Sequence, residues 1–383
     1  MVLHIVGSFV GLIKAKLHTN VDGTIFRLHY RWTTSFCFLA CALVSATEYI
    51  GNAIQCIEGR GVPSPKAMNT FCWISGTHTI NTTSGNATHY SSRGTDYLGT
   101  GNYDPNTHEL TVHSYYQWVP FVLFFQGCLF YLPHLLWKMV EGKTADNLLQ
   151  GLQFDSMDEE REKKKTNIVN YLKASAGHNV HYAITYLLCE ALNFVNVIVQ
   201  MVLLDKFFQG AFLDFGLKLF SPETSSAAIV STFPRVTKCT FQYYGPYGKL
   251  TTLRHQCLLP QNIINEKVFI AMWFWLVVLA TITAIELVWR VAVAVSPMVR
   301  LQLMERRGKL AADPNLERAI KRMHLGDYFL LTVLGINLDA GNFKDVLLKF
   351  TNCYDNSIHP NDPSYRPYNN LDEVDEGISE AAV

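Results

Sequence analysis

Cysteine is the residue whose number and placement in this sequence most directly indicate a chemistry. The chain contains nine cysteines. Four of them fall in two long polar segments, Cys56 and Cys72 in one and Cys239 and Cys257 in the other. An even set confined to such segments indicates disulfide bonds formed in an oxidising compartment, with unpaired loop thiols as the alternative. Four cysteines permit three pairings, and the sequence itself does not choose among them.

No other set of polar residues has a spacing typical of catalysis. His178 and His181 are placed so that both could bind one metal ion, but no third ligand and no His-Glu-x-x-His pattern accompanies them. The sequence also contains no glycine-rich phosphate loop and no nucleophile elbow. We therefore expect no enzymatic activity, no metal site and no other cofactor.

Charge is distributed very unevenly along the 383 residues. Only 17% of the residues are charged, against about 25% in an average soluble protein. Four apolar segments contain neither Lys nor Arg: 32–50, 116–137, 181–204 and 268–289. An evenly solvated enzyme would not segregate charge in this way. The net charge of zero also argues against a nucleic-acid partner, which would require a basic face.

Each apolar segment is long enough to span a membrane, because a helix of about 20 apolar residues crosses about 30 Å of hydrocarbon. We therefore expect an all-α membrane protein with four transmembrane helices. Pro133 lies inside the second segment, where it removes a helical hydrogen bond and produces either a hinge or a fixed kink. Such a proline is tolerated where a neighbouring helix hydrogen-bonds the freed carbonyl group.

Polar side chains share one face of the third apolar segment: Glu190, Asn193, Asn196 and Gln200. Polar groups in a bilayer point into the helix bundle and form hydrogen bonds there. We favour hydrogen bonds between helices over a place on a pore wall. Outside the membrane, the basic run 163–165 adjoins several acidic residues and is expected to form a solvated helical face.

Three features orient the chain across the membrane. Lys and Arg are modestly enriched in the segments that four spans would place on one side. The only two glycosylation sequons, at Asn81 and Asn86, lie with the four loop cysteines on the other side. Lys14 and Lys16 follow the first apolar run instead of preceding it, so we expect this segment to be retained. Together the basic bias, the sequons and the cysteines place both termini in the cytoplasm.

The expected order of the parts outside the membrane follows from this orientation. It is an N-terminal cytoplasmic or pore segment (1–31), a first extracellular loop (51–115), a cytoplasmic loop (138–180), a second extracellular loop (205–267), a helical cytoplasmic dome (290–354) and a disordered tail (355–383). The two extracellular loops exceed ordinary connections and are expected to fold together as one disulfide-linked α+β domain.

One string at the start of the second apolar segment carries a family resemblance: Tyr115, Tyr116, Gln117, Trp118 and Val119. This YYQWV string resembles the signature of the innexins, the gap-junction proteins of invertebrates, and its insect form looks closest. Further strings are similar to the family: FCWI (71–74), FYLPHLLWK (130–138), CEALNFVNVI (189–198), KCTFQYYGPYG (238–248), NEKVFIAMWFW (265–275) and GDYFLL (326–331). The chain departs from the family at Asn52-Ala53, where an acidic residue and a proline are usual.

The resemblance implies a channel. Innexin subunits assemble into rings, here expected to be octameric, around an aqueous pore, and rings of apposed cells dock through their extracellular loops. The nested pattern of the family would pair Cys56 with Cys257 and Cys72 with Cys239. The residues that the resemblance places on the pore wall are Val2, Leu3 and His4 in the N-terminal segment, and Glu48, Tyr49 and Asn52 behind them.

We therefore interpret the chain as an innexin-like subunit of plasma-membrane gap junctions, which passes ions and small metabolites passively between cells. Its partners would be further copies of itself, other innexins, a docked ring and membrane lipids. One alternative is a channel ring kept undocked by glycans on Asn81 and Asn86. The other is a four-span adhesion or scaffold protein, although tetraspanins and claudins have one dominant loop and the two loops here are nearly equal.

Overall fold

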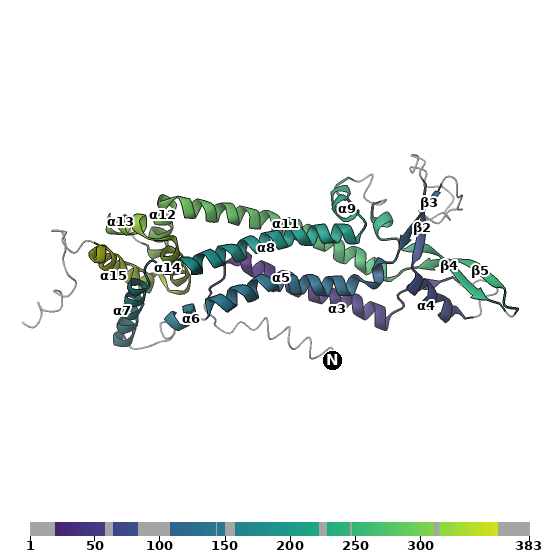
Figure 1. Ribbon diagram of the computed structural model, residues 1–383, viewed down its shortest axis with the longest axis horizontal. Coiled ribbons are helices and arrows are strands. Elements are labelled where there is room, and N and C mark those ends of the chain that lie inside the picture. The colour runs from purple at the N-terminus through teal and green to yellow at the C-terminus, as the bar shows by residue number, and fades with distance from the viewer. Residues whose placement is uncertain are drawn as a thin grey trace, which may run out of the picture. The chain divides into compact units, whose positions relative to one another are not determined.

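A computed structural model describes most of the chain (Figure 1). The described residues are 20–57, 64–82, 108–142, 144–149, 158–221, 228–245, 247–309 and 314–358. They divide between two compact units. The first, which we call the membrane unit, consists of residues 24–135 and 190–286, and the second, the helical unit, consists of residues 1–23, 136–189 and 287–383.

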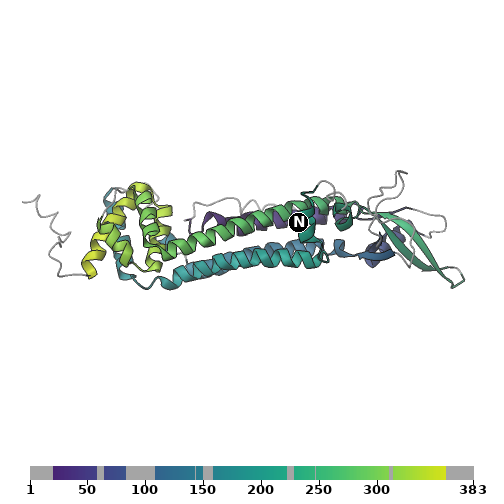
Figure 2. The same cartoon turned by 90° about the horizontal axis from the view of Figure 1, so that it is seen from above.

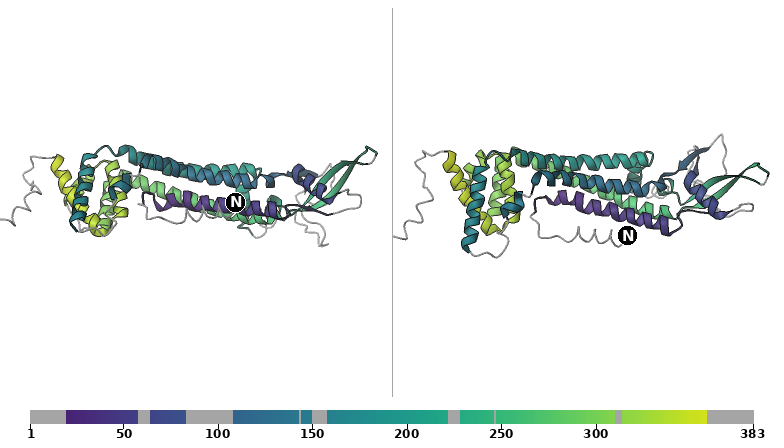
Figure 3. Two further views of the ribbon diagram at one scale, coloured as in Figure 1. Left: turned by 90° about the horizontal axis from the view of Figure 1, so that it is seen from below. Right: turned by 60° about the horizontal axis from the view of Figure 1, so that its bottom comes forward.

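Among the described residues, four helices are long and apolar enough to span a membrane, as the sequence predicts. The first runs from Thr24 to Ile50 and comprises α2 (Thr24–Arg27), the π-helical turn η1 (Leu28–Thr33) and α3 (Thr34–Ile50). The others are α5 (Val119–Glu141), α8 (Val180–Phe207) and α11 (Gln261–Val295). Within the membrane unit these helices lie side by side (Figures 2 and 3). Their shared core includes Val44, Leu123, Val197 and Phe269, none of which is exposed.

The helices extend beyond the apolar segments from which they were predicted. The first begins at Thr24 where the sequence suggested 32, and α11 begins at Gln261 where it suggested 268. At 1.5 Å per residue the 35 residues of α11 measure about 52 Å, which exceeds the hydrocarbon layer of about 30 Å. Hydropathy marks only the part of a helix that lipid surrounds, and the polar ends continue the same hydrogen bonding in water.

The segment that follows the first span and the segment that precedes the last span form one antiparallel sheet with a helix packed on it. The strands are β1 (Gln55–Cys56), β2 (Thr77–Thr82), β3 (His108–His113), β4 (Val236–Tyr244) and β5 (Leu250–Leu258), in the order β1-β5-β4-β2-β3. Strands β4 and β5 form a hairpin. The helix is α4 (Pro65–Ser75). We call α4 and β1–β5 the disulfide lobe, and it confirms that the two long loops fold together as an α+β domain.

Local sequence explains where α4 begins. The Ser64 side chain accepts a hydrogen bond from the backbone N–H of Ala67 (3.4 Å), and Pro65 occupies the first helical position. Both are typical of a helix start, since Ser supplies an acceptor for an otherwise unpaired N–H and Pro has no N–H to leave unpaired. Met68 and Cys72, one turn apart, then face the sheet and are not exposed.

The helical unit contains the ends of α5, α8 and α11 and, among the residues that the structure describes, six further helices. These are α6 (Thr144–Leu149), α7 (Asp158–Ala174), α12 (Pro297–Gly308), α13 (Pro314–Arg322), α14 (Leu325–Asn337) and α15 (Ala340–Ile358). Their core includes Leu316, Ile320, Leu334 and Phe350, all at most 2% exposed. Helix α15 continues to Ile358, so the expected start of a disordered tail at residue 355 is wrong.

The basic run on α7 is not uniformly solvated. The Lys165 side chain is only 6% exposed and its Nζ lies 2.8 Å from Glu162 Oε1 and 2.7 Å from Asp345 Oδ2 on α15. Lys163 instead remains exposed and pairs with Glu159 on its own helix. The expectation of a solvated face therefore holds for Lys163 and is wrong for Lys165, because α15 covers that side of α7.

Candidate functional site: the disulfide lobe and the second spanning helix

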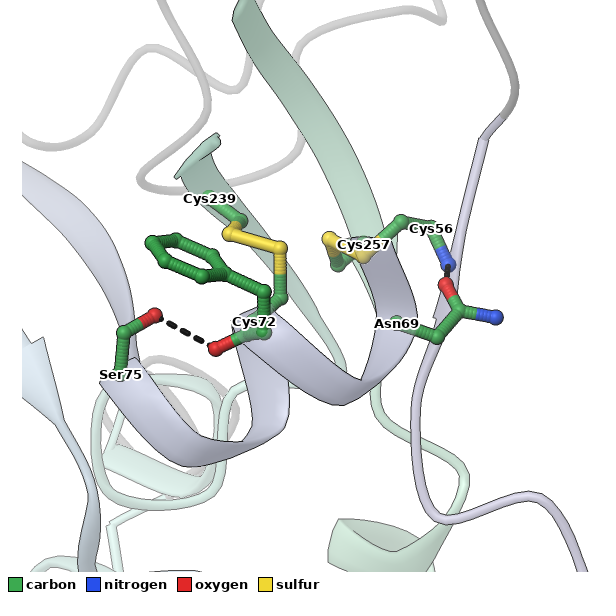
Figure 4. The surroundings of a disulfide bond; sticks show 7 residues. Cys56, Asn69, Cys72, Ser75, Cys239 and Cys257 are labelled. Carbon is green, nitrogen blue, oxygen red and sulfur yellow. Dashed lines mark hydrogen bonds between the residues drawn. A yellow bond between two sulfur atoms is a disulfide. The ribbon is translucent and has the colours of Figure 1, made fainter. Parts of the chain in front are cut away.

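Two disulfide bonds hold the lobe together. Cys56 is bonded to Cys257 and Cys72 to Cys239, across sequence separations of 201 and 167 residues (Figure 4). This is the nested pairing that the family resemblance implies, and each bond joins the segment after the first span to the segment before the last. Three of the sulfurs lie within 4.8 Å of one another. They are consumed in disulfide bonds, so they offer no thiolate to a metal ion.

Secondary structure places the four cysteines. In the pairing of β1 with β5, Cys56 lies directly opposite Cys257. On β4 alternate residues point to the interior, and Cys239 is one of them at 1% exposed. Helix α4 covers the sheet with Cys72, and its Asn69 Oδ1 accepts a hydrogen bond from the backbone N–H of Cys56 (2.9 Å; Figure 4). All four sulfur atoms therefore belong to the small apolar core of the lobe.

The YYQWV string joins this lobe to the second spanning helix. Tyr116 lies in the short helix η2 (Tyr115–Gln117) and is fully buried, with its ring centroid 4.6 Å from that of Trp73 on α4. The Gln117 amide Nε2 donates to the carbonyl oxygens of Trp73 and, at 3.3 Å, Ile74. These carbonyls lie in the last turn of α4, where no later residue of the helix supplies a backbone N–H. The string therefore supplies the hydrogen bonds that the end of α4 lacks.

The other residues of the string face the bundle and the membrane border. The Tyr115 hydroxyl donates to the backbone oxygen of Thr232 (3.0 Å), and its ring lies 5.2 Å from that of Phe208 at the end of α8. Val119 begins α5 and is not exposed. Trp118 is 60% exposed, as expected of an aromatic anchor at a membrane interface.

Pro133 interrupts the hydrogen bonding of α5, and the neighbouring helix α8 compensates. Because proline has no N–H, the carbonyl oxygen of Leu129, four residues earlier, has no regular helical donor. The side-chain Nδ2 of Asn196 donates to this oxygen at 3.3 Å. Gln200 in turn donates to Asn196 Oδ1 at 3.4 Å. Asn196 therefore makes the bond between helices that we favoured for the polar face of the third span. Glu190 and Asn193 are buried on the same helix.

Sequence reasoning missed a second polar cluster, in the first spanning helix. The Thr33 hydroxyl donates to the Leu28 carbonyl five residues earlier (3.0 Å) and accepts a hydrogen bond from Trp275 Nε1 (2.8 Å). His29 Nε2 lies 2.9 Å from Thr283 Oγ1 on α11. These bonds surround η1, and π-helical turns are frequent at functional sites. The predicted span began at residue 32 and so excluded most of this turn.

The π-helical turn is also in contact with the proline of the second span. The ring of Tyr30 stacks on that of His134, with centroids 3.6 Å apart and an angle of 4° between the planes. His134 directly follows Pro133, so the irregular turns of two helices lie against each other. The spacing of four between His29 and Thr33 on one helical face was the available signal.

The predicted pore-lining residues are only partly described. Glu48 is half-buried near the end of α3, Tyr49 is 80% exposed and Asn52 is exposed just after the helix. Val2, Leu3, His4 and Asn86 lie outside the described residues, while the backbone of Asn81 lies in β2 opposite Glu109. A place on a pore wall therefore stays a prediction for each of these candidates.

Two histidines lie inside the lobe beside basic residues. Burial, with a smaller contribution from nearby His78, lowers the pKa of His113 to about 4. His113 Nε2 lies 2.8 Å from Thr79 Oγ1. Burial likewise lowers the pKa of His78, with smaller contributions from Lys238 and Arg254. Both imidazoles are consequently neutral in the folded lobe at neutral pH.

Comparison with known proteins agrees with this architecture. The Innexin family model matches residues 22–354. Innexin inx3 of Drosophila melanogaster is 35% identical over 380 residues, covering 97% of this chain and 95% of the relative. Innexin shaking-B of the same species is 34% identical, covering 95% and 98%. Innexin inx2 of Schistocerca americana is 37% identical, covering 89% and 95%. The fold is that of a four-span membrane protein with a disulfide-linked lobe. The family match and these relatives show that the chain belongs to the innexins.

Replacing Gln117 by Glu tests the junction with α4. The carboxylate has the shape of the amide but faces two carbonyl oxygens without a donor, so we expect the protein to lose about 1–3 kcal/mol of stability. The measurement is the unfolding temperature of the purified full-length protein in detergent. Gln242→Glu, at an exposed position of β4, is the matched control. Equal unfolding temperatures for the two variants would contradict this role of Gln117.

A double-mutant cycle tests whether Asn196 compensates for Pro133. Asn196→Leu should cost about 1 kcal/mol in the natural chain, because it leaves the Leu129 carbonyl without a donor. Pro133→Ala restores the backbone N–H, so Asn196→Leu should cost distinctly less in that background. Thermal unfolding of all four proteins gives the coupling. The same cost in both backgrounds would show that the two residues act independently.

The buried histidine predicts a pH dependence of stability. Above pH 6.5, the ordinary pKa, His113 is neutral in the folded and unfolded chains and its full contribution to stability is present. As the pH falls from 6.5 through about 4, the unfolded chain binds a proton that the folded lobe rejects, so stability decreases. His113→Gln should make the unfolding temperature less dependent on pH over this range, whereas His178→Gln, an exposed position, should not. An unchanged pH dependence in His113→Gln would count against this assignment.

Proposed function

We propose that this chain is a subunit of a gap-junction channel that passes ions and small metabolites passively between cells. Membership of the innexin family carries the proposal. The four spanning helices and the lobe built from two distant loops support it, because both are needed in a channel that crosses one membrane and meets a second one.

The orientation follows from sulfur chemistry. Disulfide bonds form in oxidising compartments, so we place the disulfide lobe outside the cell. Four spans then put both termini and the helical unit in the cytoplasm. The backbone of Asn81 lies in β2 of the same lobe, so this orientation places the sequon in the compartment where glycosylation takes place.

The first spanning helix is the candidate pore wall. Several large side chains along one side of it are not covered by the rest of the chain, including Leu39 at 68%, Tyr49 at 80% and Ile50 at 87% exposed. In a ring, such a face meets the neighbouring subunit or the pore. We propose an octameric ring of this chain, alone or mixed with other innexins, with the N-terminal segment folded into the pore. Selectivity would then depend on pore width and wall charge, with Glu48 as a contributor.

Docking is assigned to the tip of the β4–β5 hairpin. Tyr244 and Tyr247 are 75% and 98% exposed there. Exposed tyrosines are costly in water and are enriched as anchors of protein interfaces, where the ring is buried and the hydroxyl can still find a partner. We propose that these rings pack against a second ring of subunits from the apposed cell.

Paired cells that express the chain test the proposal. Tyr247→Ser should lower the junctional conductance by about tenfold or more while current through undocked channels in single cells persists, because an interface anchor is lost and the pore is not. Tyr171→Ser, an exposed tyrosine of α7, is the control.

The same recordings separate the alternatives. Absence of any current in single cells that carry the protein at their surface would favour an adhesion or scaffold role. Junctional current that appears only after Asn81 and Asn86 are replaced by Gln would favour an undocked channel. Equal junctional conductance for Tyr247→Ser and the natural chain would contradict docking through the hairpin tip.

A further inference from the structure

The helical unit contains a pocket of about 130 Å³ at the ends of two spanning helices. Ala183 and Leu187 of α8 form one side, in the first turns of that helix, and Trp289, Arg290, Val293 and Ala294 of α11 form another. The remaining wall is Leu303, Met304 and Arg307 of α12 with Leu325, Tyr328, Phe329 and Thr332 of α14. The proposed function of the channel does not use it.

The pocket combines apolar walls with two guanidinium groups. Arg290 and Arg307 are the charged residues of the lining, and none of the lining residues is acidic. Arg307 Nη1 donates to the Thr332 carbonyl at 2.8 Å, which fixes the side chain in the wall. The guanidinium of a third arginine, Arg300, lies 5.8 Å from the ring centroid of Tyr328. Three guanidinium groups therefore lie in or beside one small, largely hydrophobic pocket.

The surroundings show that this charge is poorly solvated. Burial lowers the pKa of Arg307, and the positive charge of Arg290 lowers it further, although Tyr328 opposes the effect. Burial raises the pKa of Tyr328. The guanidinium of Arg290 lies 5.5 Å from the ring centroid of Tyr186. An anion in the pocket would stabilise the charged form of both lining arginines.

The position of the pocket, at the end of the apolar segment of α11, indicates which kind of anion would bind there. Residues 268–289 of α11 contain no Lys or Arg, so Arg290 is the first basic residue beyond the hydrocarbon layer. A basic residue at the end of an apolar span is typical of the border where lipid headgroups begin. The volume accommodates a phosphate with the first carbons attached, and the apolar side chains of Leu187, Val293 and Phe329 suit those carbons.

We propose that this pocket is a binding site for the phosphate headgroup of an anionic membrane phospholipid, held by Arg290 and Arg307. The phosphate accepts charge-assisted hydrogen bonds from the two guanidinium groups, and the glycerol and first acyl carbons lie on the apolar wall. None of its lining residues belongs to the disulfide lobe or to the first spanning helix.

Native mass spectrometry of the delipidated full-length protein tests the site, with phosphatidic acid as the probe and phosphatidylcholine as the uncharged comparison. The natural chain should bind phosphatidic acid preferentially. Arg307→Gln should weaken this binding by about tenfold, because a charged hydrogen-bond donor is lost. Arg306→Gln removes the same charge from an exposed position next to it and should leave binding unchanged.

A second variant protects the test against misfolding of Arg307→Gln. Ala294→Met keeps both arginines and fills the pocket, and it should weaken phosphatidic acid binding as well. Equal lipid binding by all four proteins would overturn the proposal. So would displacement of the lipid by inorganic phosphate at equal concentration, since the site would then recognise a soluble anion without its acyl chain.

Discussion

A peptide group surrounded by hydrocarbon must find its hydrogen bond inside the protein, and this constraint shapes the membrane unit. Where the spanning helices are regular, each satisfies its own backbone. Where they are not, side chains of neighbours complete the bonding, as Asn196 does for the Leu129 carbonyl near Pro133. The π-helical turn of the first span is handled in the same way, through Thr33 and Trp275. The rings of Tyr30 and His134 stack between the π-helical turn and the turn at Pro133. The interruptions of helical hydrogen bonding in the two helices therefore lie at one place in the bundle.

The structure of the disulfide lobe depends on a different constraint, which is the small size of its apolar core. A small sheet with one helix buries too little apolar surface to be stable alone, and cross-links between distant segments compensate by restricting the unfolded chain. The two bonds here close very long loops that contain the second and third spans. Because its strands come from two segments that the second and third spans separate in sequence, the lobe forms only where the bundle brings both segments together.

These constraints also explain what the sequence could predict. Segments surrounded by lipid are apolar in composition, so the four spans could be identified from residue types. The two-loop domain and its cysteines could be identified from the polar segments between them. Helix ends could not, because residues such as Gln261 and Thr24 are polar and still helical. The burial of Lys165 depends on Asp345, 180 residues away, and no local pattern encodes that contact. The disulfide pairing required the family resemblance, since three pairings satisfy the same spacing.

The aromatic cluster at the lobe end of the bundle joins three of the four spans. Tyr115 before α5, Phe208 at the end of α8 and Phe269 on α11 form a chain of ring contacts, at 5.2 and 4.8 Å between centroids. Three spans are thereby fastened together beneath the lobe. The first span ends at Tyr49 and Ile50, both at least 80% exposed, and the side chain of the preceding Glu48 forms a hydrogen bond with Gln261 of α11. The helix that we assign to the pore wall therefore takes no part in these ring contacts, and its hydrogen bonds to the other spans, near η1 and at Glu48, set its position.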